Sequence, residues 1–345
     1  MGEGITIIGG GLSGLTLGIG LRQRGVPVRV WEAAAYPRHR VCGEFISGLG
    51  LGSLTRLGLL EALHESGKAR PAVTAAFFAG KTSVKARALP EAALCIPRFD
   101  LDDWLAREFT KWGGELVLST RWSGESGPGI VHASGRRPEP AGLGWRLFGL
   151  KAHASDVTLD ADLEMHFVPE GYVGLSRQSH GRVNICGLFR TRAPVPELRQ
   201  RWREWLGGAP NSVLNQRLAV AQIDPASFCS VAALSLRPRR ACGRAEFCVG
   251  DALTMIPPVT GNGMSMAFES AELAIDPLSR YSQGDLDWSE AGRQYARLCD
   301  DRFSARLRWA GWLQPLLLQP VARAGLVFGA VHFPALIQWL FARTR

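Results

Sequence analysis

One glycine-rich turn near the start of the chain constrains the fold more than any other stretch. The segment Gly4-Ile-Thr-Ile-Ile-Gly-Gly-Gly-Leu-Ser-Gly-Leu15 places an apolar run directly before three spaced glycines, Gly9, Gly11 and Gly14. A strand that runs through such a turn into a helix distinguishes a dinucleotide-binding fingerprint from a chance glycine cluster. The first glycine permits the tight turn, the second lets the backbone approach a pyrophosphate, and the third lets the helix pack closely on the strand.

A second apolar run supplies the acidic residue that this fingerprint requires. The run Val26-Pro-Val-Arg-Val-Trp31 leads directly to Glu32, 18 positions after Gly14. An acidic residue at this spacing accepts hydrogen bonds from a ribose hydroxyl. The sequence therefore predicts a nucleotide cofactor, with its adenosine and pyrophosphate held by Gly9, Gly11, Leu12, Ser13, Gly14 and Glu32.

Length and charge exclude several classes of protein. A chain of 345 residues can bury a sizeable core and form two connected domains. The formal net charge is +9, but the basic residues are scattered or in short clusters such as Arg237-Pro-Arg-Arg240, which favours solvated surface over a patch for an anionic partner. No nucleic-acid-binding motif accompanies the charge, so no nucleic-acid partner is expected.

The cysteines and histidines give no sign of a metal site. The seven cysteines form no C-x-x-C pair, and the histidines lack metal-ligand spacing, so we expect neither bound metal nor a disulfide framework. The first predicted strand leaves no room for a signal peptide before it. We therefore expect a cytoplasmic protein.

The middle of the chain predicts a second sheet. Residues 72–78 and 82–89 have strand character and form a predicted hairpin around Gly80-Lys81, and short strands separated by turn residues follow from about Trp145 to Leu236. A helical insert is predicted over 195–206, and the run Leu116–Leu118 is predicted to return to the parallel sheet. Further helices are predicted over 49–66, from an Asp100 N-cap to Gly113, and over 263–280, 286–312 and 313–343.

The last of these stretches is strongly apolar. Gln, Arg and Pro interrupt its apolar runs well short of the roughly 20 residues that span a bilayer, so it is not a transmembrane helix. Two alternatives are open: helices that cover the substrate domain, which we favour, or an interfacial surface in peripheral contact with a membrane.

A second motif lies more than 200 residues after the first. A buried strand ends at Gly250-Asp251, a Pro-Pro loop follows, and Gly261-Asn262-Gly263 precedes a new helix. The Asp251 carboxylate can accept from the hydroxyls of a sugar-alcohol chain. The helix N-terminus favours an anion, and a reduced flavin carries negative charge on its pyrimidine side.

Together these motifs resemble the FAD-dependent aromatic-hydroxylase superfamily over roughly residues 4–275. The resemblance rests on the glycine triplet with Glu32, on Arg98 at the start of a helix, on Ala133-Ser-Gly135 and on the Gly250-to-Met264 stretch. It implies a bound FAD, with Arg98 near the pyrophosphate or ribityl chain and Asp251 on the ribityl chain. The residues implied beside the isoalloxazine ring are Pro258, Gly261, Asn262, Gly263 and Met264.

The segment Pro37-Arg-His-Arg-Val-Cys-Gly-Glu-Phe-Ile-Ser47 resembles one branch of this superfamily, which holds geranylgeranyl reductases and flavin-dependent halogenases. Two departures limit what the resemblance implies. Ser134-Gly135 stands where many hydroxylases carry Asp-Gly, so the electrons come either directly from NAD(P)H or through a separate reductase. The halogenase Trp-x-Trp-x-Ile-Pro pattern is absent and no lysine precedes Lys68, which disfavours halogenation.

Cys42 and Glu44 are the candidate catalytic residues, because in this branch the Cys-Gly-Glu segment passes near the flavin and the substrate. Cys42 is either a redox-active or substrate-contacting thiol, or a small buried residue in a tight loop. Glu44 is either a proton donor or, as we favour, a carboxylate stabilised at a helix N-terminus.

The expected fold class is α/β (α+β overall), with a Rossmann-like FAD-binding domain, a β-sheet substrate domain and C-terminal helices. The FAD-binding domain is predicted from residues 1–70, 96–139 and 241–285, the sheet domain from 71–95 and 140–240, and the helical region from 286–345. Three functions are open: a monooxygenase acting on an apolar, biosynthetic small molecule, a reductase of carbon–carbon double bonds in a prenyl or lipid-like substrate, or a non-catalytic flavin-binding partner protein.

Overall fold

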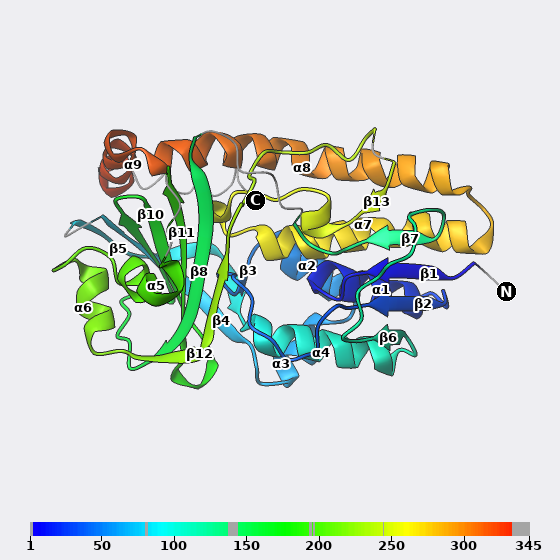
Figure 1. Ribbon diagram of the computed structural model, residues 1–345, viewed down its shortest axis with the longest axis horizontal. Helices are drawn as coiled ribbons and strands as arrows, with labels where there is room; N and C mark the ends of the chain where they lie inside the picture. The colour runs from blue at the N-terminus through cyan, green and yellow to red at the C-terminus, as the bar shows by residue number, and fades with distance from the viewer. Residues whose placement is uncertain are drawn as a thin grey trace.

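Two sheets lying side by side form the framework of the molecule (Figure 1). The computed structural model describes residues 3–332 except 80–81, 137–143, 193–194, 196 and 244. One sheet has five strands in the order β13-β7-β1-β2-β6, and the other has eight in the order β12-β8-β11-β10-β9-β4-β5-β3. The α/β fold class with a second, β-sheet half is confirmed.

The five-stranded sheet is parallel throughout, which requires helical crossovers that cover its faces. Its strands are β1 (Ile5–Ile8), β2 (Val28–Trp31), β6 (Glu115–Val117), β7 (Ile130–His132) and β13 (Phe247–Cys248). Its covering helices include α1 (Leu12–Gln23), α4 (Arg98–Lys111) and α7 (Gly263–Gln283). One apolar core joins strands and helices, with Ile7, Leu15 and Phe268 completely buried.

The eight-stranded sheet is antiparallel except where β4 runs parallel to β9. Its strands are β3 (Phe45–Ile46), β4 (Arg70–Ala79), β5 (Thr82–Cys95), β8 (Arg146–Ser155), β9 (Leu163–Val168), β10 (Gly171–Arg177), β11 (Val183–Thr191) and β12 (Gln222–Val231). The even-numbered β8 residues Phe148, Leu150 and Ala152 pack with α5 (Leu198–Gly207) and α6 (Val213–Ala219). The odd-numbered residues face the other way, because side chains alternate along a strand.

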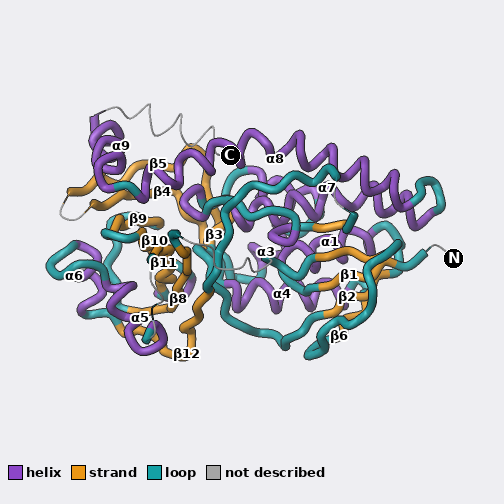
Figure 2. Tube along the Cα trace, turned by 45° about the horizontal axis from the view of Figure 1, so that its top comes forward, coloured by secondary structure: helices purple, strands orange, loops and turns teal. Residues whose placement is uncertain are grey.

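The long helix α8 (Trp288–Leu318) connects the two halves. Its residues from Ala291 to Ala310, including Phe303 and Leu307, pack in the core of the parallel sheet, whereas Leu313 and Leu317 pack against the eight-stranded sheet. Figures 1 and 2 both show α8 extending along one side of the molecule, with α9 (Pro320–His332) after it at the far end. The helix therefore covers both sheets, as the covering-helix alternative predicts for this part of the chain.

Several predicted helix boundaries are wrong for local reasons. The stretch 49–66 forms two helices, α2 (Leu49–Arg56) and α3 (Leu60–Glu65), because Gly58 between them adopts φ +66°. Pro97, not Asp100, caps α4, and Asp100 lies in its first turn. The helical insert begins at Leu198 rather than 195.

The C-terminal helices also differ from expectation. The predicted break at 312–313 does not exist, and α8 continues to Leu318, where extended Gln319 precedes Pro320. Strands β4 and β5 exceed their predicted lengths, while the hairpin turn Gly80-Lys81 and the end of the last predicted helix lie outside the described residues. The predicted domain boundaries stay a prediction.

In the part of the chain that the structure describes, no helix combines the length and apolar character needed to cross a membrane.

A buried ion pair fastens α8 to α7 and gives a test of this packing. The two guanidinium nitrogens of Arg306 contact the two carboxylate oxygens of Glu269 at 2.7 Å each, and both side chains are almost fully buried. Glu269→Met should lower the free energy of unfolding by about 3–5 kcal/mol, because it leaves a buried cation unpaired.

The double variant Glu269→Met/Arg306→Met should recover much of that loss, since both charges are then gone. Thermal unfolding measures both variants, with Glu290→Gln on the exposed start of α8 as the control that should change little. A single variant as stable as the parent protein would contradict the role of this pair.

Candidate functional site

The first glycine turn has the geometry that its sequence predicts. Gly9 adopts φ +112°, and a Cβ there would lie 2.4 Å from the carbonyl oxygen of Ala133; a Cβ on Gly14 would lie 2.0 Å from that of Gly9. A Cβ on Gly11, by contrast, would meet no atom within 4 Å. Packing therefore requires glycine at the outer two positions, and the backbone at Gly11 is open to a ligand.

Glu32 lies next to this turn and is already well supplied with donors. Its carboxylate accepts from the backbone N–H of Gly10 at 2.9 Å and of Ala34 at 3.0 Å, and Arg38 pairs with it at 2.7 Å. Burial alone would raise its pKa, but Arg38 and the two N–H groups bring the pKa below its usual value. Glu32 is thus an ionised group oriented toward the turn, and a ribose hydroxyl would share its oxygens with these donors.

The second motif lies directly against the first. Gly250 adopts φ +61°, and a Cβ there would lie 2.0 Å from the hydroxyl oxygen of Ser13, in the first turn of α1. Its own N–H donates to the Ser270 hydroxyl at 2.9 Å. This close approach brings Asp251, in the short 3-10 helix η2 (Gly250–Ala252), to the N-terminal end of α1.

Arginines surround Asp251. Asp251 lies at an exposed position, but desolvation of its carboxylate by the surrounding protein raises its pKa to about 6, against the lowering effect of Arg98, Arg136 and Arg40. Arg98 is neutralised by a bidentate contact with Asp102 at 2.7 and 2.8 Å. Arg40 and Arg136 have no such partner: Arg40 Nε and Arg136 Nη1 are buried without a hydrogen-bond acceptor among the described residues.

These orphaned guanidinium atoms fit a pyrophosphate. Arginine is suited to bidentate binding of phosphate oxygens, and an unpaired buried donor is costly until an acceptor arrives. Sequence reasoning selected Arg98 and missed Arg40 and Arg136, although Arg40 stands in the segment that carried the family resemblance. An excess of arginines over acidic residues in the segments expected near the glycine turn is the sequence feature that could have indicated them.

The loop expected beside the isoalloxazine ring is joined to the Cys-Gly-Glu segment. Gly261 adopts φ +67°, and a Cβ there would lie 2.3 Å from the Phe45 ring. The Ser47 hydroxyl donates to the Asn262 side-chain oxygen at 3.2 Å, and the Ser265 hydroxyl donates to the Ser47 carbonyl at 2.5 Å. Gly263 begins α7 and Met264 is buried, whereas Pro258 is exposed in η3 (Pro258–Thr260).

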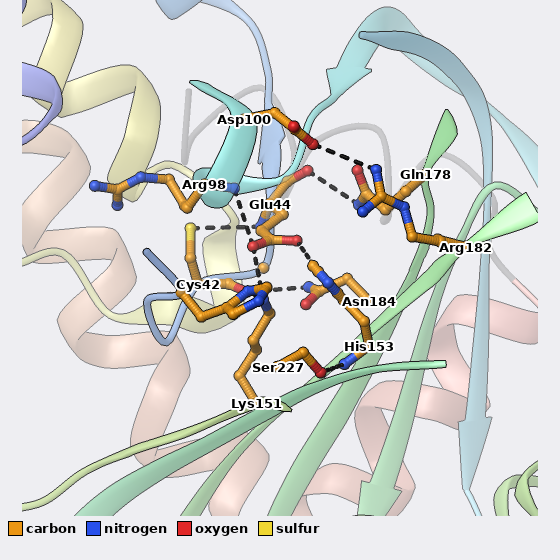
Figure 3. A network of polar contacts seen from close by, with 12 residues as sticks. Cys42, Glu44, Arg98, Asp100, Lys151, His153, Gln178, Arg182, Asn184 and Ser227 are labelled. Carbon is orange, nitrogen blue, oxygen red and sulfur yellow. Dashed lines mark hydrogen bonds and ion pairs between the residues drawn. The ribbon is translucent and has the colours of Figure 1, made fainter. Parts of the chain in front are cut away.

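Glu44 is the centre of a buried polar network that sequence reasoning did not predict (Figure 3). Its carboxylate contacts Lys151 Nζ at 3.0 Å and His153 Nε2 at 2.6 Å, both on β8. It also accepts from the backbone N–H of Arg98, the first residue of α4, at 3.0 Å. In Figure 3 the Arg98 side chain extends away from Glu44 while its backbone nitrogen faces the carboxylate.

This geometry places Glu44 at a helix N-terminus, as expected if it is a stabilised carboxylate rather than a proton donor. The side chain is completely buried, and its pKa is lowered despite burial, because His153, Lys151 and the α4 N-terminus favour the anion. An ionised carboxylate with three donors does not donate a proton. Glu44 also adopts φ +56°, a strained conformation that persists only where the surroundings hold it.

The network continues toward the surface through His39. The half-buried His39 ring stacks on Phe99, and its Nδ1 lies 3.2 Å from Lys151 Nζ. Burial and the neighbouring Lys151 and His153 lower the pKa of His39 to about 4, so the ring is neutral at pH 7 and accepts from the Lys151 ammonium. The local sequence could not reveal this contact, since residues 39, 44 and 151 meet only in the folded chain.

Cys42 lies beside Glu44 with a protonated thiol. Its sulfur accepts from the Glu44 backbone N–H at 3.4 Å, and burial raises the pKa of the thiol. The side chain is partly accessible. The arrangement therefore supports neither a thiolate nucleophile nor a metal ligand, and no group of metal-binding side chains occurs within the described ranges.

Comparison with known proteins identifies the cofactor domain. The family described as an FAD binding domain matches residues 4–132. The chain carries an FAD-binding domain. No curated protein matches the sequence.

The whole chain also shares its fold with solved flavoproteins. It is similar to the flavin-dependent brominase Bmp2, with 18% identity and a TM-score of 0.75 over 97% of this chain and 92% of that one. It is similar to pqsL, a probable FAD-dependent monooxygenase from Pseudomonas aeruginosa, with 16% identity and a TM-score of 0.69 over 94% and 99%. A flavoprotein/dehydrogenase from Cytophaga hutchinsonii matches at 17% identity and 0.70, over 91% and 87%.

These findings confirm the resemblance to the FAD-dependent aromatic-hydroxylase superfamily. At such low identity, the structural likeness shows the fold alone. The assignment of individual cofactor-binding residues stays a prediction. Substitution of Arg40 tests it.

Arg40→Met should weaken FAD binding and stabilise the apoprotein. Loss of a charge-assisted hydrogen bond to a phosphate costs about 1.5–3 kcal/mol, so the dissociation constant for FAD should rise roughly tenfold or more. Without FAD the same change removes a desolvated, unpaired cation, and the melting temperature should rise. Fluorescence titration with FAD and thermal unfolding of the apoprotein give the two readouts, with exposed Arg121→Met as the control; an unchanged FAD affinity would contradict the assignment.

Glu44→Gln should destabilise the protein in a pH-dependent manner. Removing the carboxylate leaves Lys151 buried beside a neutral group, at a cost of about 3–5 kcal/mol at pH 7. The pKa of Glu44 is lower in the folded than in the unfolded protein. The stability that the parent protein has over the variant is therefore fully present above about pH 4.5 and is lost as the pH falls through the folded pKa.

The difference in unfolding free energy between parent and variant, measured at several pH values, checks this dependence. Glu204→Gln, in an exposed pair with Arg201, is the matched control. Adding Lys151→Met to Glu44→Gln should restore part of the stability. A difference that grows toward acid pH would exclude an ionised Glu44.

Proposed function

We propose that the protein is an FAD-dependent monooxygenase that acts on an apolar, uncharged small molecule. Bound FAD would supply the redox chemistry and the activation of oxygen, and the protein would supply binding, orientation and electrostatics. The glycine turn, Arg40 and Arg136 would hold its pyrophosphate, and Asp251 its ribityl hydroxyls. The loop 258–264 would lie beside its ring system.

The proposal is supported by the apolar and small residues on the sheet face next to that loop. Val259 packs in one apolar cluster with Tyr172 and Leu188 of the eight-stranded sheet. The adjacent row across the sheet pairs Met165 with Gly174, Gly174 with Cys186, and Cys186 with Lys151. The loop expected beside the flavin ring thus lies close to a row of small and sulfur-containing residues.

This row offers a surface for an uncharged substrate. Met165, Gly174 and Cys186 are partly accessible although they lie on central strands. A Cβ on Gly174 would meet only the strand carbonyl oxygens of Cys186 and Glu164, at 3.7 and 3.9 Å, and no atom of the parallel-sheet half. Lys151, the charged member of the row, is fully buried and paired with Glu44. Apolar and neutral ligands are favoured, because the charge of Lys151 is compensated by Glu44.

A reductase of carbon–carbon double bonds is the second candidate, and Cys42 is the observation in its favour. A thiol with a raised pKa stays protonated at pH 7 and can donate the proton that must accompany hydride transfer to an alkene. The engaged Glu44 carboxylate offers no alternative donor in that segment. Electrons for either reaction would come from NAD(P)H or a separate flavin reductase.

One experiment separates the two candidates. The FAD-loaded protein is reduced without oxygen by NADH, NADPH or dithionite and is then mixed with air or, anaerobically, with geranylgeraniol. A monooxygenase should be reoxidised rapidly by air, with one hydrogen peroxide released per flavin when no substrate is present. A reductase should resist air and be reoxidised by the alkene.

Cys42→Ala sharpens the test. It should leave the reaction of the reduced protein with air unchanged under the first proposal, and it should slow alkene reduction under the second. Exposed Cys242→Ala is the matched control. Reduced protein that neither air nor the alkene reoxidises, or a preparation that binds no FAD, would overturn both candidates.

A further inference from the structure

The two sides of the C-terminal part of α8 have different surroundings. Leu313 and Leu317 pack against the eight-stranded sheet. On the opposite side Trp312 is 65% exposed, and Pro315 is exposed as well. Figures 1 and 2 show α8 along one edge of the molecule, with both sheets on the same side of it. The side of α8 that carries Trp312 therefore faces outward.

The outward-facing residues continue from α8 into α9. Val321, the second residue of α9, is 87% exposed. Arg308 is exposed one turn before Trp312, because residues four apart share one face of a helix. We call Arg308, Trp312, Pro315 and Val321 the outer face. Exposed apolar side chains that gather in one place, rather than singly, mark a surface that contacts a partner or a membrane.

The charges along this part of the chain have one sign. Residues 302–345 contain six arginines and neither aspartate nor glutamate. Two of these arginines pair with Glu269 of α7, so their charge is compensated. Arg308 lies on the outer face itself. The outer face thus combines apolar side chains with a cation, and its own sequence segment supplies no acid.

A second pairing of tryptophan with arginine lies near the end of α8. Trp145 is 45% exposed, and the guanidinium carbons of Arg190 and Arg192 lie 4.1 and 4.7 Å from the centre of one of its rings. Leu147, two residues after Trp145, packs in the same apolar cluster as Leu317. The start of β8 therefore brings an exposed tryptophan and its arginines close to the part of α8 that carries the outer face.

The surface of an anionic membrane fits these features. Tryptophan is favoured where the headgroups of a bilayer meet its acyl chains, because its ring is apolar and its N–H is polar. Arginine binds the phosphate oxygens of lipid headgroups, and its stem lies along apolar surface. A helix that presents both kinds of side chain lies in the plane of the membrane without crossing it.

A second copy of the chain fits the outer face less well. In a two-fold contact the outer face of one molecule would meet the same face of the other. Arg308 would then approach the same arginine of the other copy, and residues 302–345 hold no acid to compensate the two charges. Like charges brought together cost free energy. The charge of the outer face therefore favours an anionic partner.

We propose that the outer face binds the surface of an anionic membrane, with Trp312 and Val321 in the headgroup region and Arg308 and Arg192 on lipid phosphates. Helix α8 then has both of the roles that its sequence leaves open, because its inner side covers the sheets and its outer side contacts lipid. The contact is independent of the proposed oxidoreductase activity and can be measured without substrate.

Co-sedimentation of the purified full chain with lipid vesicles tests the proposal. One set of vesicles contains phosphatidylcholine alone, and the other contains equimolar phosphatidylcholine and phosphatidylglycerol. The partition coefficient should be about tenfold or more higher for the anionic vesicles, because each arginine near the membrane surface is attracted to the negative lipids. Added salt should reduce this difference.

Matched variants locate the contact. Trp312→Ser should lower the partition coefficient for anionic vesicles about tenfold, because it removes apolar surface that enters the membrane. Trp112→Ser, at the exposed tryptophan that ends α4, is the control that should bind like the parent protein. Arg308→Gln should weaken binding about fivefold. Arg107→Gln removes the same charge from the exposed side of α4 and should change binding little.

None of these variants lies in the predicted FAD site, so their FAD content and melting temperature should equal those of the parent protein. The proposal is overturned if the anionic vesicles bind no more protein than the neutral ones, or if Trp312→Ser and Arg308→Gln bind like their controls. A parent protein that sediments as a dimer and becomes monomeric on Trp312→Ser would also overturn it, because a second copy would then cover the outer face.

Discussion

Gly250 packs directly against Ser13 in the first turn of α1. This contact joins the two distant sequence motifs, and a Cβ at Gly250 would lie 2.0 Å from the Ser13 hydroxyl oxygen. Because of it, the carboxylate at the end of β13 reaches the N-terminal end of α1, where the glycine turn exposes its backbone. The turn alone indicates only a nucleotide, and we propose that the turn and Asp251 together hold the two ends of FAD.

The second sheet is attached to that site through Glu44. Its carboxylate lies between the N-terminus of α4 and the side chains of Lys151 and His153 on β8, so one buried charge links the nucleotide-binding half to the sheet. The backbone of the same segment is fixed as well: Ser176 donates to the Gly43 carbonyl at 2.8 Å and Asn184 to that of Cys42 at 3.0 Å. The Cys-Gly-Glu segment is thereby held rigidly at the junction of the two halves, beside the loop 261–264. Helix α8 completes the connection by covering both sheets.

The elements predicted best from sequence are those whose signal is local. The strand–turn–helix around Gly9 and the short strand that precedes Asp251 follow from apolar runs and glycines, and the short strands of the second sheet follow from turn residues. The prediction of one helix over 49–66 is wrong because Gly58 alone is enough to end a helix. The apolar pattern continues on both sides of Gly58 and therefore does not indicate the break. The predicted N-cap of α4 is wrong because Pro97, and not Asp100, stands at the N-cap position.

The chemical partners of the site could not be predicted in the same way. Nothing near Glu44 in the chain indicates Lys151 or His153, which reach it only through the register of β8 in a sheet of eight strands. Arg40 stands in a segment that the sequence singled out, but the lack of an acceptor for its Nε among the described residues is a property of the folded protein.

If the two distant motifs form one FAD site, FAD binds only when both motifs keep their geometry. The most direct test is the stoichiometry of FAD bound to the purified protein and to Gly250→Val, measured from the flavin absorbance after removal of free cofactor. We expect one FAD per chain in the parent protein and almost none in Gly250→Val, because the valine side chain forces the 250–252 turn away from Ser13. A variant that retains one FAD per chain, or a parent protein that binds none, would contradict it.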